Sequence, residues 1–190
     1  MKISEHHNFL TAEECQTLID LAGDSFSRAT VVGPTSEAYH HGRTAESAWI
    51  PQDNAHSIAI KARIAELIGI PVCNMEQVSV VRYKAGGEYQ PHVDWFNPDD
   101  PSFMACTLFG GQRLCSVLIY LNDGYVGGET DFPNVAMKIT PELGKALVWY
   151  NHDDSGELTQ DSLHAGMPVI SGLKYIAIVW VREQKYWGDV

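Results

Sequence analysis

The chain has 190 residues, of which 45% are hydrophobic and 19% charged, a composition that excludes a disordered segment and suffices for one domain with a hydrophobic core. Its formal net charge of -11 argues against nucleic-acid partners, since binding a phosphate backbone needs a concentrated basic surface. The N-terminus lacks a secretory signal, no apolar run spans a bilayer, and the four cysteines form no C-x-x-C pair, so we expect a cytoplasmic monomer or homodimer without membrane partners.

Two helices are predicted in the first third of the chain. Thr11 and Glu14 fit a capping box, and the apolar stripe that follows them at helical spacing ends at Gly23. A second helix is expected to begin near residues 53–54 and to end at Gly69, where a proline follows two positions later.

From residue 76 onward the pattern changes to short strands separated by glycine-rich turns. Helices followed by many strands favour an antiparallel sandwich or barrel with the helices packed on one side. We therefore expect one domain over residues 1–190, with a helical part at about 1–75 and a sheet core at about 76–185. Residues 97–112 are predicted to form a long loop of the kind that is often functional. The predicted strands are Gln77–Tyr83, Leu114–Leu121, Lys145–Tyr150 and Lys174–Arg182.

A histidine and an aspartate lie two positions apart on an extended segment. The side chains of His92 and Asp94 would point to the same face of a strand, where an imidazole and a carboxylate can bind one ion. The pair alone is weak evidence, because a histidine on a strand is more often hydrogen-bonded in the packing than bound to a metal.

A second histidine, His164, begins a later predicted strand and supplies a candidate third ligand. Two histidines and one carboxylate form the facial triad of non-haem Fe(II) oxygenases, which leaves coordination positions open. Zinc hydrolases also use two histidines and a carboxylate, so the ligand set does not identify the metal.

Lys174 distinguishes between these alternatives. It begins a predicted strand on which Ile176, Ile178, Trp180 and Arg182 share its face. A lysine at a strand end is usually solvated. At the head of an apolar face, however, it is well placed to pair with the far carboxylate of a dicarboxylic acid inside a barrel.

Several ordered motifs carry a family resemblance over nearly the whole chain. They are residues 82–96 (RYKAGGEYQPHVDWF), 110–113 (GGQR) with 116–122 (SVLIYLN), 127–133 (GGETDFP) and 163–166 (LHAG), followed by Gly172, Lys174 and Trp180. In these stretches the chain resembles prolyl 4-hydroxylase-type Fe(II)- and 2-oxoglutarate-dependent dioxygenases.

The resemblance implies a fold and a set of roles. The fold would be mostly β, a double-stranded β-helix (jelly-roll) barrel. His92, Asp94 and His164 would bind Fe(II). Lys174 would pair with the C5 carboxylate of 2-oxoglutarate, and Tyr83 would donate a hydrogen bond to it. With dioxygen, the cosubstrate would yield succinate and carbon dioxide while an unactivated carbon is hydroxylated; ascorbate is a further candidate cofactor.

The resemblance also implies a proline-containing peptide or protein as substrate. Arg113, Arg182 and Trp180 resemble positions that line the peptide cleft. Arg43 and Trp49 resemble the loop over the site, bordered by His40 and His41, although Ala45 departs from the common Arg-Thr-Ser pattern there. For each arginine, a solvent-facing salt bridge is an equally good interpretation.

Two alternatives remain open. One keeps the chemistry and changes the substrate to another amino-acid side chain or a small molecule. The other is a metal-binding jelly-roll module without catalysis, against which Lys174 and Tyr83 argue, since such a module needs no dicarboxylate clamp. Without a repeat domain or an endoplasmic-reticulum signal, the chain is expected to be a free-standing catalytic domain.

Overall fold

The computed structural model describes residues 2–29 and 42–187, so His40 and His41 lie outside the described residues. Within the described ranges, no helix is long and apolar enough to cross a membrane. The helices are α1 (Ala12–Ala22), α2 (Ala55–Ile68) and the short α3 (Phe103–Thr107). The strands are β1 (Ile3–His6), β2 (Ser27–Arg28), β3 (Glu46–Trp49), β4 (Ser79–Lys84), β5 (Tyr89–His92), β6 (Arg113–Tyr120), β7 (Val126–Gly127), β8 (Thr130–Phe132), β9 (Met137–Ile139), β10 (Ala146–Tyr150), β11 (His164–Gly166), β12 (Val169–Ser171) and β13 (Leu173–Arg182).

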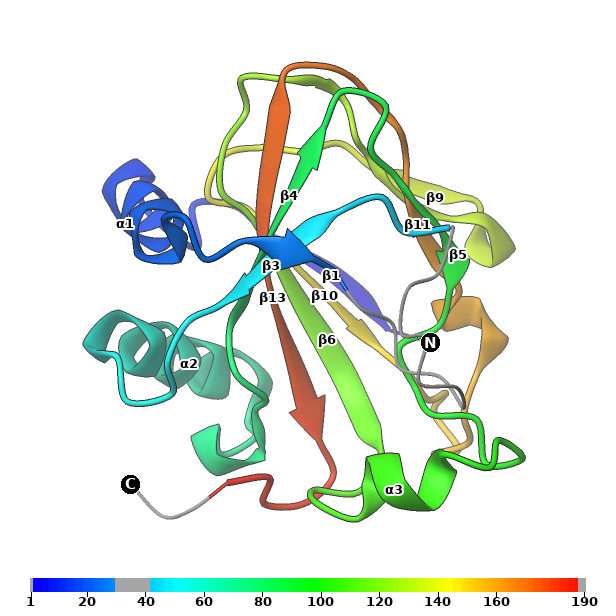
Figure 1. Cartoon of the computed structure of the whole chain (residues 1–190). Helices are drawn as coiled ribbons and strands as arrows, with labels where there is room; N and C mark the ends of the chain where they lie inside the picture. The colour runs from blue at the N-terminus through cyan, green and yellow to red at the C-terminus, as the bar shows by residue number, and fades with distance from the viewer. Residues whose placement is uncertain (1, 30–41, 188–190) are drawn as a thin grey trace.

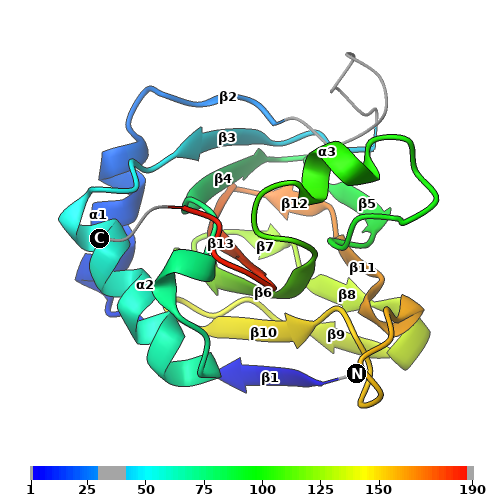
Figure 2. The same ribbon diagram turned by 90° about the horizontal axis from the view of Figure 1, so that it is seen from below.

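Two antiparallel sheets face each other (Figure 1). The larger sheet has seven strands in the order β1-β10-β6-β13-β4-β3-β2, and the smaller has four in the order β5-β11-β8-β9. A third pair, β7 and β12, adjoins them. Figure 2, seen from below, shows the smaller sheet on the side of the larger sheet that is opposite α1 and α2. The predicted jelly-roll architecture, mostly β with flanking helices, is confirmed.

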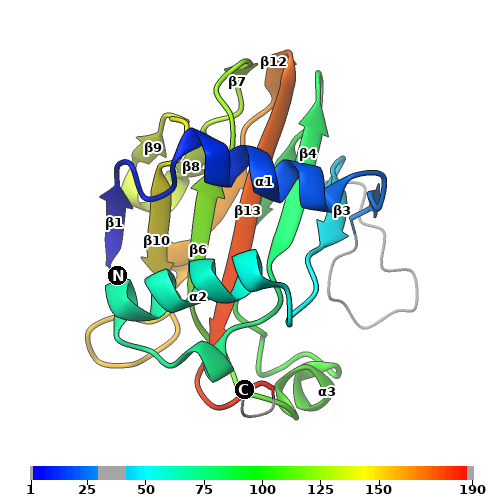
Figure 3. The same ribbon diagram turned by 90° about the vertical axis from the view of Figure 1, so that its left-hand side faces the viewer.

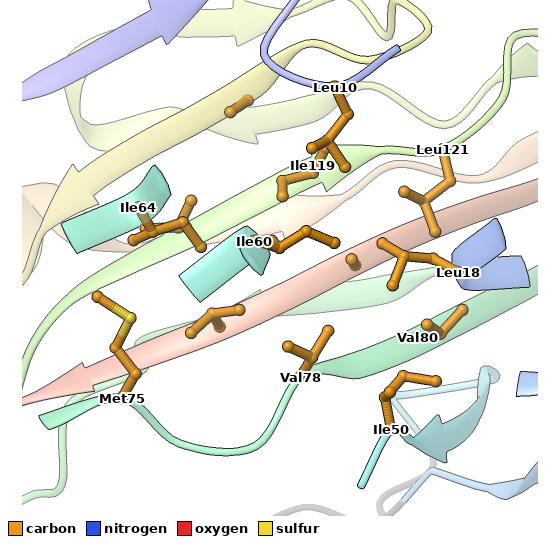
Figure 4. Packing of buried hydrophobic residues seen from close by; sticks show 14 of the residues in the cluster. Leu10, Leu18, Ile50, Ile60, Ile64, Met75, Val78, Val80, Ile119 and Leu121 are labelled. Carbon is orange, nitrogen blue, oxygen red and sulfur yellow. The ribbon is translucent and has the colours of Figure 1, made fainter. Parts of the chain in front are cut away.

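The N-terminal helices cover the outer face of the larger sheet (Figure 3). The predicted capping box is present in α1, where the Thr11 hydroxyl accepts from the Glu14 N–H and the Glu14 carboxylate accepts from the Thr11 N–H. Leu18 of α1 and Ile60 and Ile64 of α2 pack onto Val80 and other buried strand residues (Figure 4). This apolar layer fixes the sheet from behind and leaves its other face for the site.

The strands of the larger sheet alternate between two cores. On β6, Val117 and Ile119 join the core under the helices, whereas Leu118 and Tyr120 point into the space between the sheets. The same two-residue period on β13 places Ile176 and its inward neighbours between the sheets. Every second residue of these strands therefore faces the space between the sheets, where the site lies.

Two features differ from the sequence analysis. The predicted helical part also contains β1, β2 and β3, which pair with the larger sheet because their backbone groups complete its edges. The predicted loop at residues 97–112 contains α3, a short helix whose Thr107 hydroxyl bonds back to the Phe103 carbonyl.

Candidate active site

His92, Asp94 and His164 converge between the two sheets. One ligand atom from each lies within 4.8 Å of the others. The Asp94 Oδ1 atom lies 3.8 Å from Nε2 of His92, and Oδ2 lies 3.7 Å from Nε2 of His164. These separations suit three ligands around one ion, and two imidazoles with one carboxylate suit Fe(II).

Strand pairing brings the ligands together from distant parts of the sequence. β5 and β11 pair antiparallel, with His92 directly opposite His164. Asp94 follows just after the end of β5 and is 7% exposed. Its Oδ2 atom accepts a hydrogen bond of 2.6 Å from the Ser116 hydroxyl, and its backbone carbonyl accepts one from Arg113.

Both imidazoles present Nε2 to the site. Nδ1 of His92 lies 2.8 Å from the Gln90 carbonyl oxygen, and Nδ1 of His164 lies 2.9 Å from that of Ser162. A carbonyl oxygen only accepts, so each Nδ1 carries the proton and each Nε2 has a free lone pair. This tautomer is the one that binds a metal through Nε2.

The electrostatics favour the ligand forms of the side chains. Burial, followed by the neighbouring His164, lowers the pKa of His92 to about 3, so its imidazole is neutral. Burial alone would raise the pKa of Asp94. His164 and His92, together with Arg113 and Ser116, outweigh that effect and lower it, so Asp94 is a carboxylate.

Lys174 extends from the inner face of β13 and is 2% exposed. Its ammonium donates a hydrogen bond of 2.7 Å to the Gly128 carbonyl and lies 5.1 Å from the centroid of the Tyr83 ring. Burial lowers the pKa of Lys174 to about 8, opposed by Glu129. A buried ammonium bonded to a neutral carbonyl is well suited to receive a carboxylate.

The triad and Lys174 open onto the same cavity. With hard oxygen and imidazole donors at the triad and a cation at Lys174, the cavity fits an iron ion and a dicarboxylate. Its lining consists of Arg43, Val81, Tyr83, Tyr89, His92, Asp94, Leu118, Thr130, Trp149, His164, Gly166, Lys174, Ile176, Ile178 and Trp180.

Two of the predicted substrate residues lie at this cavity. The Arg43 guanidinium stacks 4.7 Å from the centroid of the Tyr89 ring. The Trp180 ring lies 6.2 Å from that of Trp49, which is 49% exposed. Arg43 and Trp180 thus line the same cavity as the triad of His92, Asp94 and His164, and Trp49 extends the aromatic surface outward to solvent.

Arg113 and Arg182 lie elsewhere, in a buried ion cluster, and not in the cavity lining. Arg113 makes a two-pronged pair with Glu76, at 2.7 and 2.9 Å, and Arg182 approaches the same carboxylate at 2.6 Å. Both guanidiniums lie within 5 Å of the Phe96 ring centroid. Neither arginine faces solvent, as the alternative interpretation would require, because both are buried in ion pairs with Glu76. Arg113 also bonds to the Asp94 carbonyl, and Arg182 packs on Phe96 in the segment that follows Asp94.

Four residues at or beside the site were not predicted from the sequence. Tyr89 stacks on the His92 ring with centroids 3.5 Å apart, and Thr130 accepts or donates a 2.7 Å bond with the buried Tyr120 hydroxyl. The Trp149 ring lies 4.6 Å from that of His164. Ser116 stood out in the sequence as a polar residue within an apolar strand, and Tyr89 and Thr130 lie within the motifs of the family resemblance.

Comparisons with known proteins agree with this geometry. Residues 78–182 match the model of the 2OG-Fe(II) oxygenase superfamily. A putative prolyl 4-hydroxylase of Acanthamoeba polyphaga mimivirus is 35% identical over 184 residues, which cover 95% of this chain and 74% of that protein. The crystal structure of a viral collagen prolyl hydroxylase from Paramecium Bursaria Chlorella virus-1, in its 2OG complex, is 30% identical with a TM-score of 0.73, and the match covers 96% of each chain.

Longer relatives match as well. The prolyl 4-hydroxylase subunit alpha-1 of Bos taurus is 34% identical over 187 residues, which cover 96% of this chain. The chain spans only 35% of the length of that relative. The chain is therefore a prolyl 4-hydroxylase-type member of the 2OG-Fe(II) oxygenase superfamily.

Proposed function

We propose that the chain is an Fe(II)- and 2-oxoglutarate-dependent dioxygenase that hydroxylates prolyl residues in a peptide or protein. The observation that carries the proposal is that Lys174 and the three ligand residues face one cavity. A site that only held a metal would gain nothing from a buried ammonium, which costs folding free energy.

Different residues of the cavity would bind the metal and the cosubstrate. Iron supplies the activation of dioxygen, coupled to oxidative decarboxylation of 2-oxoglutarate. His92, Asp94 and His164 would hold the ion, and three protein ligands would leave coordination positions for cosubstrate and dioxygen. Lys174 would pair with the distal carboxylate, beside the Tyr83 ring.

Apolar side chains keep water from the reacting atoms. Leu118, Ile176 and Ile178 line the cavity and are each at most 6% exposed. Excluding water strengthens the electrostatic interactions in the site and protects reactive intermediates.

Aromatic residues at and beside the cavity support a prolyl substrate. Trp180 and the exposed Trp49 offer apolar ring surface on which a pyrrolidine ring can pack. The related proteins named as prolyl hydroxylases support the same substrate class. Dioxygen is the second cosubstrate beside 2-oxoglutarate, and ascorbate is a candidate reductant.

Location and assembly belong to the same proposal. We place the chain in the cytoplasm as a monomer or homodimer without nucleic-acid or membrane partners. The four free thiols, of Cys15, Cys73, Cys106 and Cys115, and the formal net charge of -11 support this placement.

The test combines enzyme, Fe(II) and 2-oxoglutarate anaerobically, followed by ¹⁸O₂ and a panel of proline-containing peptides. We expect succinate and a peptide that has gained one labelled oxygen on proline, and neither product with His164→Ala. Succinate with oxygen on another side chain would replace the prolyl assignment. Absence of succinate under every condition would overturn the dioxygenase itself.

A further inference from the structure

Ser116 is a buried polar residue in the middle of an apolar strand. It lies on β6, is 0% exposed, and shares its inward face with Leu118 and Tyr120. A buried hydroxyl costs free energy unless it is hydrogen-bonded. Burying an apolar side chain at this position would cost less free energy, so we expect a partner group that accepts a hydrogen bond from the hydroxyl.

That partner is the iron ligand Asp94. The Ser116 Oγ atom lies 2.6 Å from Oδ2 of Asp94, within the range of hydrogen bonds to a charged oxygen. An ionised carboxylate only accepts, so Ser116 is the donor. Trp149 and Trp180 lie opposite Ser116 on the two neighbouring strands, and this enclosure limits where the hydroxyl can turn.

Each of the three ligand residues has one such outer partner. His92 and His164 donate from Nδ1 to backbone carbonyls, of Gln90 and Ser162. Asp94 instead accepts from a side chain, which substitution can remove without disturbing the backbone. The bond uses Oδ2, which lies 3.7 Å from His164 Nε2, and leaves Oδ1, 3.8 Å from His92 Nε2, without this donor.

We propose that Ser116 is a positioning residue that restricts Asp94 to binding the metal through one oxygen. A carboxylate bound through both oxygens would occupy a position that cosubstrate or dioxygen needs. The inference rests on the metal site of the proposed function and adds a residue that controls how many positions remain open.

The test uses metals that do not turn over. Mn(II) binding to Ser116→Ala, Ser116→Thr and the parent protein is measured from the electron paramagnetic resonance signal of the free ion. Loss of an outer partner lowers metal affinity roughly 10- to 100-fold, so we expect at least a tenfold loss in Ser116→Ala. Ser116→Thr keeps the hydroxyl and is expected to bind within about threefold of the parent, a difference of less than about 1 kcal/mol.

The visible absorption of bound Co(II) depends on the identity and arrangement of its ligands. We expect a band that differs from that of the parent in Ser116→Ala and a parent-like band in Ser116→Thr. Ser57→Ala is the matched control, since Ser57 is equally buried, on α2, and its hydroxyl has no hydrogen-bond partner among the described residues. It should change neither readout.

Parent-like Mn(II) affinity and Co(II) absorption in Ser116→Ala would overturn the proposal. So would an equal loss in a natively folded Ser116→Thr, because packing and not the hydroxyl would then be responsible. Should Ser116→Thr not fold, the comparison of Ser116→Ala with Ser57→Ala decides. Neither measurement needs turnover or a peptide, so a failure of prolyl hydroxylation would leave this result interpretable.

Discussion

Lys174 lies directly opposite Tyr83 in the register of β13 and β4, with its ammonium 5.1 Å from the centroid of the tyrosine ring. The two side chains therefore meet at one end of the cavity although they are far apart in the sequence. His92, Asp94 and His164 line the same cavity, so a ligand that both chelates a metal there and carries a second carboxylate could also reach Lys174.

Replacing Lys174 by methionine should stabilise the fold and abolish the binding of 2-oxoglutarate. Burial lowers the pKa of Lys174 to about 8, below its usual value, so the folded protein holds this proton less well than the unfolded chain. Below pH 8 the charged lysine therefore lowers the free energy of unfolding of the protein without cosubstrate. This destabilisation diminishes as the pH rises above 8. At pH 7 we expect Lys174→Met to raise the free energy of unfolding by about 2 kcal/mol, after loss of the bond to Gly128.

Urea denaturation measures that change, and calorimetry with Mn(II) present measures 2-oxoglutarate binding. The variant should lose cosubstrate binding and keep its affinity for Mn(II). Loss of Mn(II) with intact 2-oxoglutarate affinity would show that the roles are assigned wrongly.

The affinity for 2-oxoglutarate should fall as the solution becomes more alkaline. The ammonium form of Lys174 pairs with the carboxylate, and its pKa of about 8 means that the free site loses its charge above pH 8. We expect the dissociation constant to rise about tenfold per pH unit above that value, with little change between pH 6.5 and 7.5. Calorimetry of the Mn(II) protein measures it. Lys174→Arg, which stays charged, should flatten the profile; a parent protein with a flat profile would contradict the prediction.

Glu76 should be important for stability. Its carboxylate compensates two buried guanidiniums, those of Arg113 and Arg182. We expect Glu76→Gln to lower the free energy of unfolding by about 3–5 kcal/mol, because it leaves buried charge without a counterion. Glu46→Gln is the control, since Glu46 pairs with Arg82 near the surface and its loss should cost at most about 1 kcal/mol. Equal effects in urea denaturation would rule out a special role for the buried cluster.

Trp49 should contribute to peptide affinity and not to the handling of cosubstrate. It is half exposed beside Trp180, outside the part of the cavity that holds Lys174. We expect Trp49→Ala to raise the KM for a prolyl peptide about fivefold to tenfold, equivalent to about 1–1.4 kcal/mol, and to leave the KM for 2-oxoglutarate unchanged. Leu21→Ala, on the outer helix α1, should change neither constant. A parallel rise in both constants would indicate general distortion.

Metal binding should stabilise the fold through the triad. An ion that binds only the native state adds about 2.7 kcal/mol at 100 times its dissociation constant. Mn(II) should therefore raise the melting temperature of the metal-free protein and leave that of His164→Ala unchanged. A comparable rise in the variant would place the ion at another site.

The sequence by itself determined the two long helices, the main strands and the candidate reacting groups. The capping box of Thr11 and Glu14, the strand periodicity and the His92–Asp94 pair are local patterns, and local patterns follow from backbone geometry that any window of sequence displays. With them came the main strands after the two long helices and, through the family resemblance, the prediction that Lys174 pairs with the cosubstrate.

Only the tertiary structure decided which residues meet. Arg113 and Arg182 look alike as surface or cleft residues in the sequence, and the position of Glu76 between them is a long-range contact that no local pattern displays. The hydrogen bond of Ser116 is also a long-range contact, because the fold brings its Oγ atom on β6 to 2.6 Å from Oδ2 of Asp94. Burial then sets the pKa of Lys174, since desolvation depends on all the chain that surrounds the ammonium and not on its neighbours in sequence.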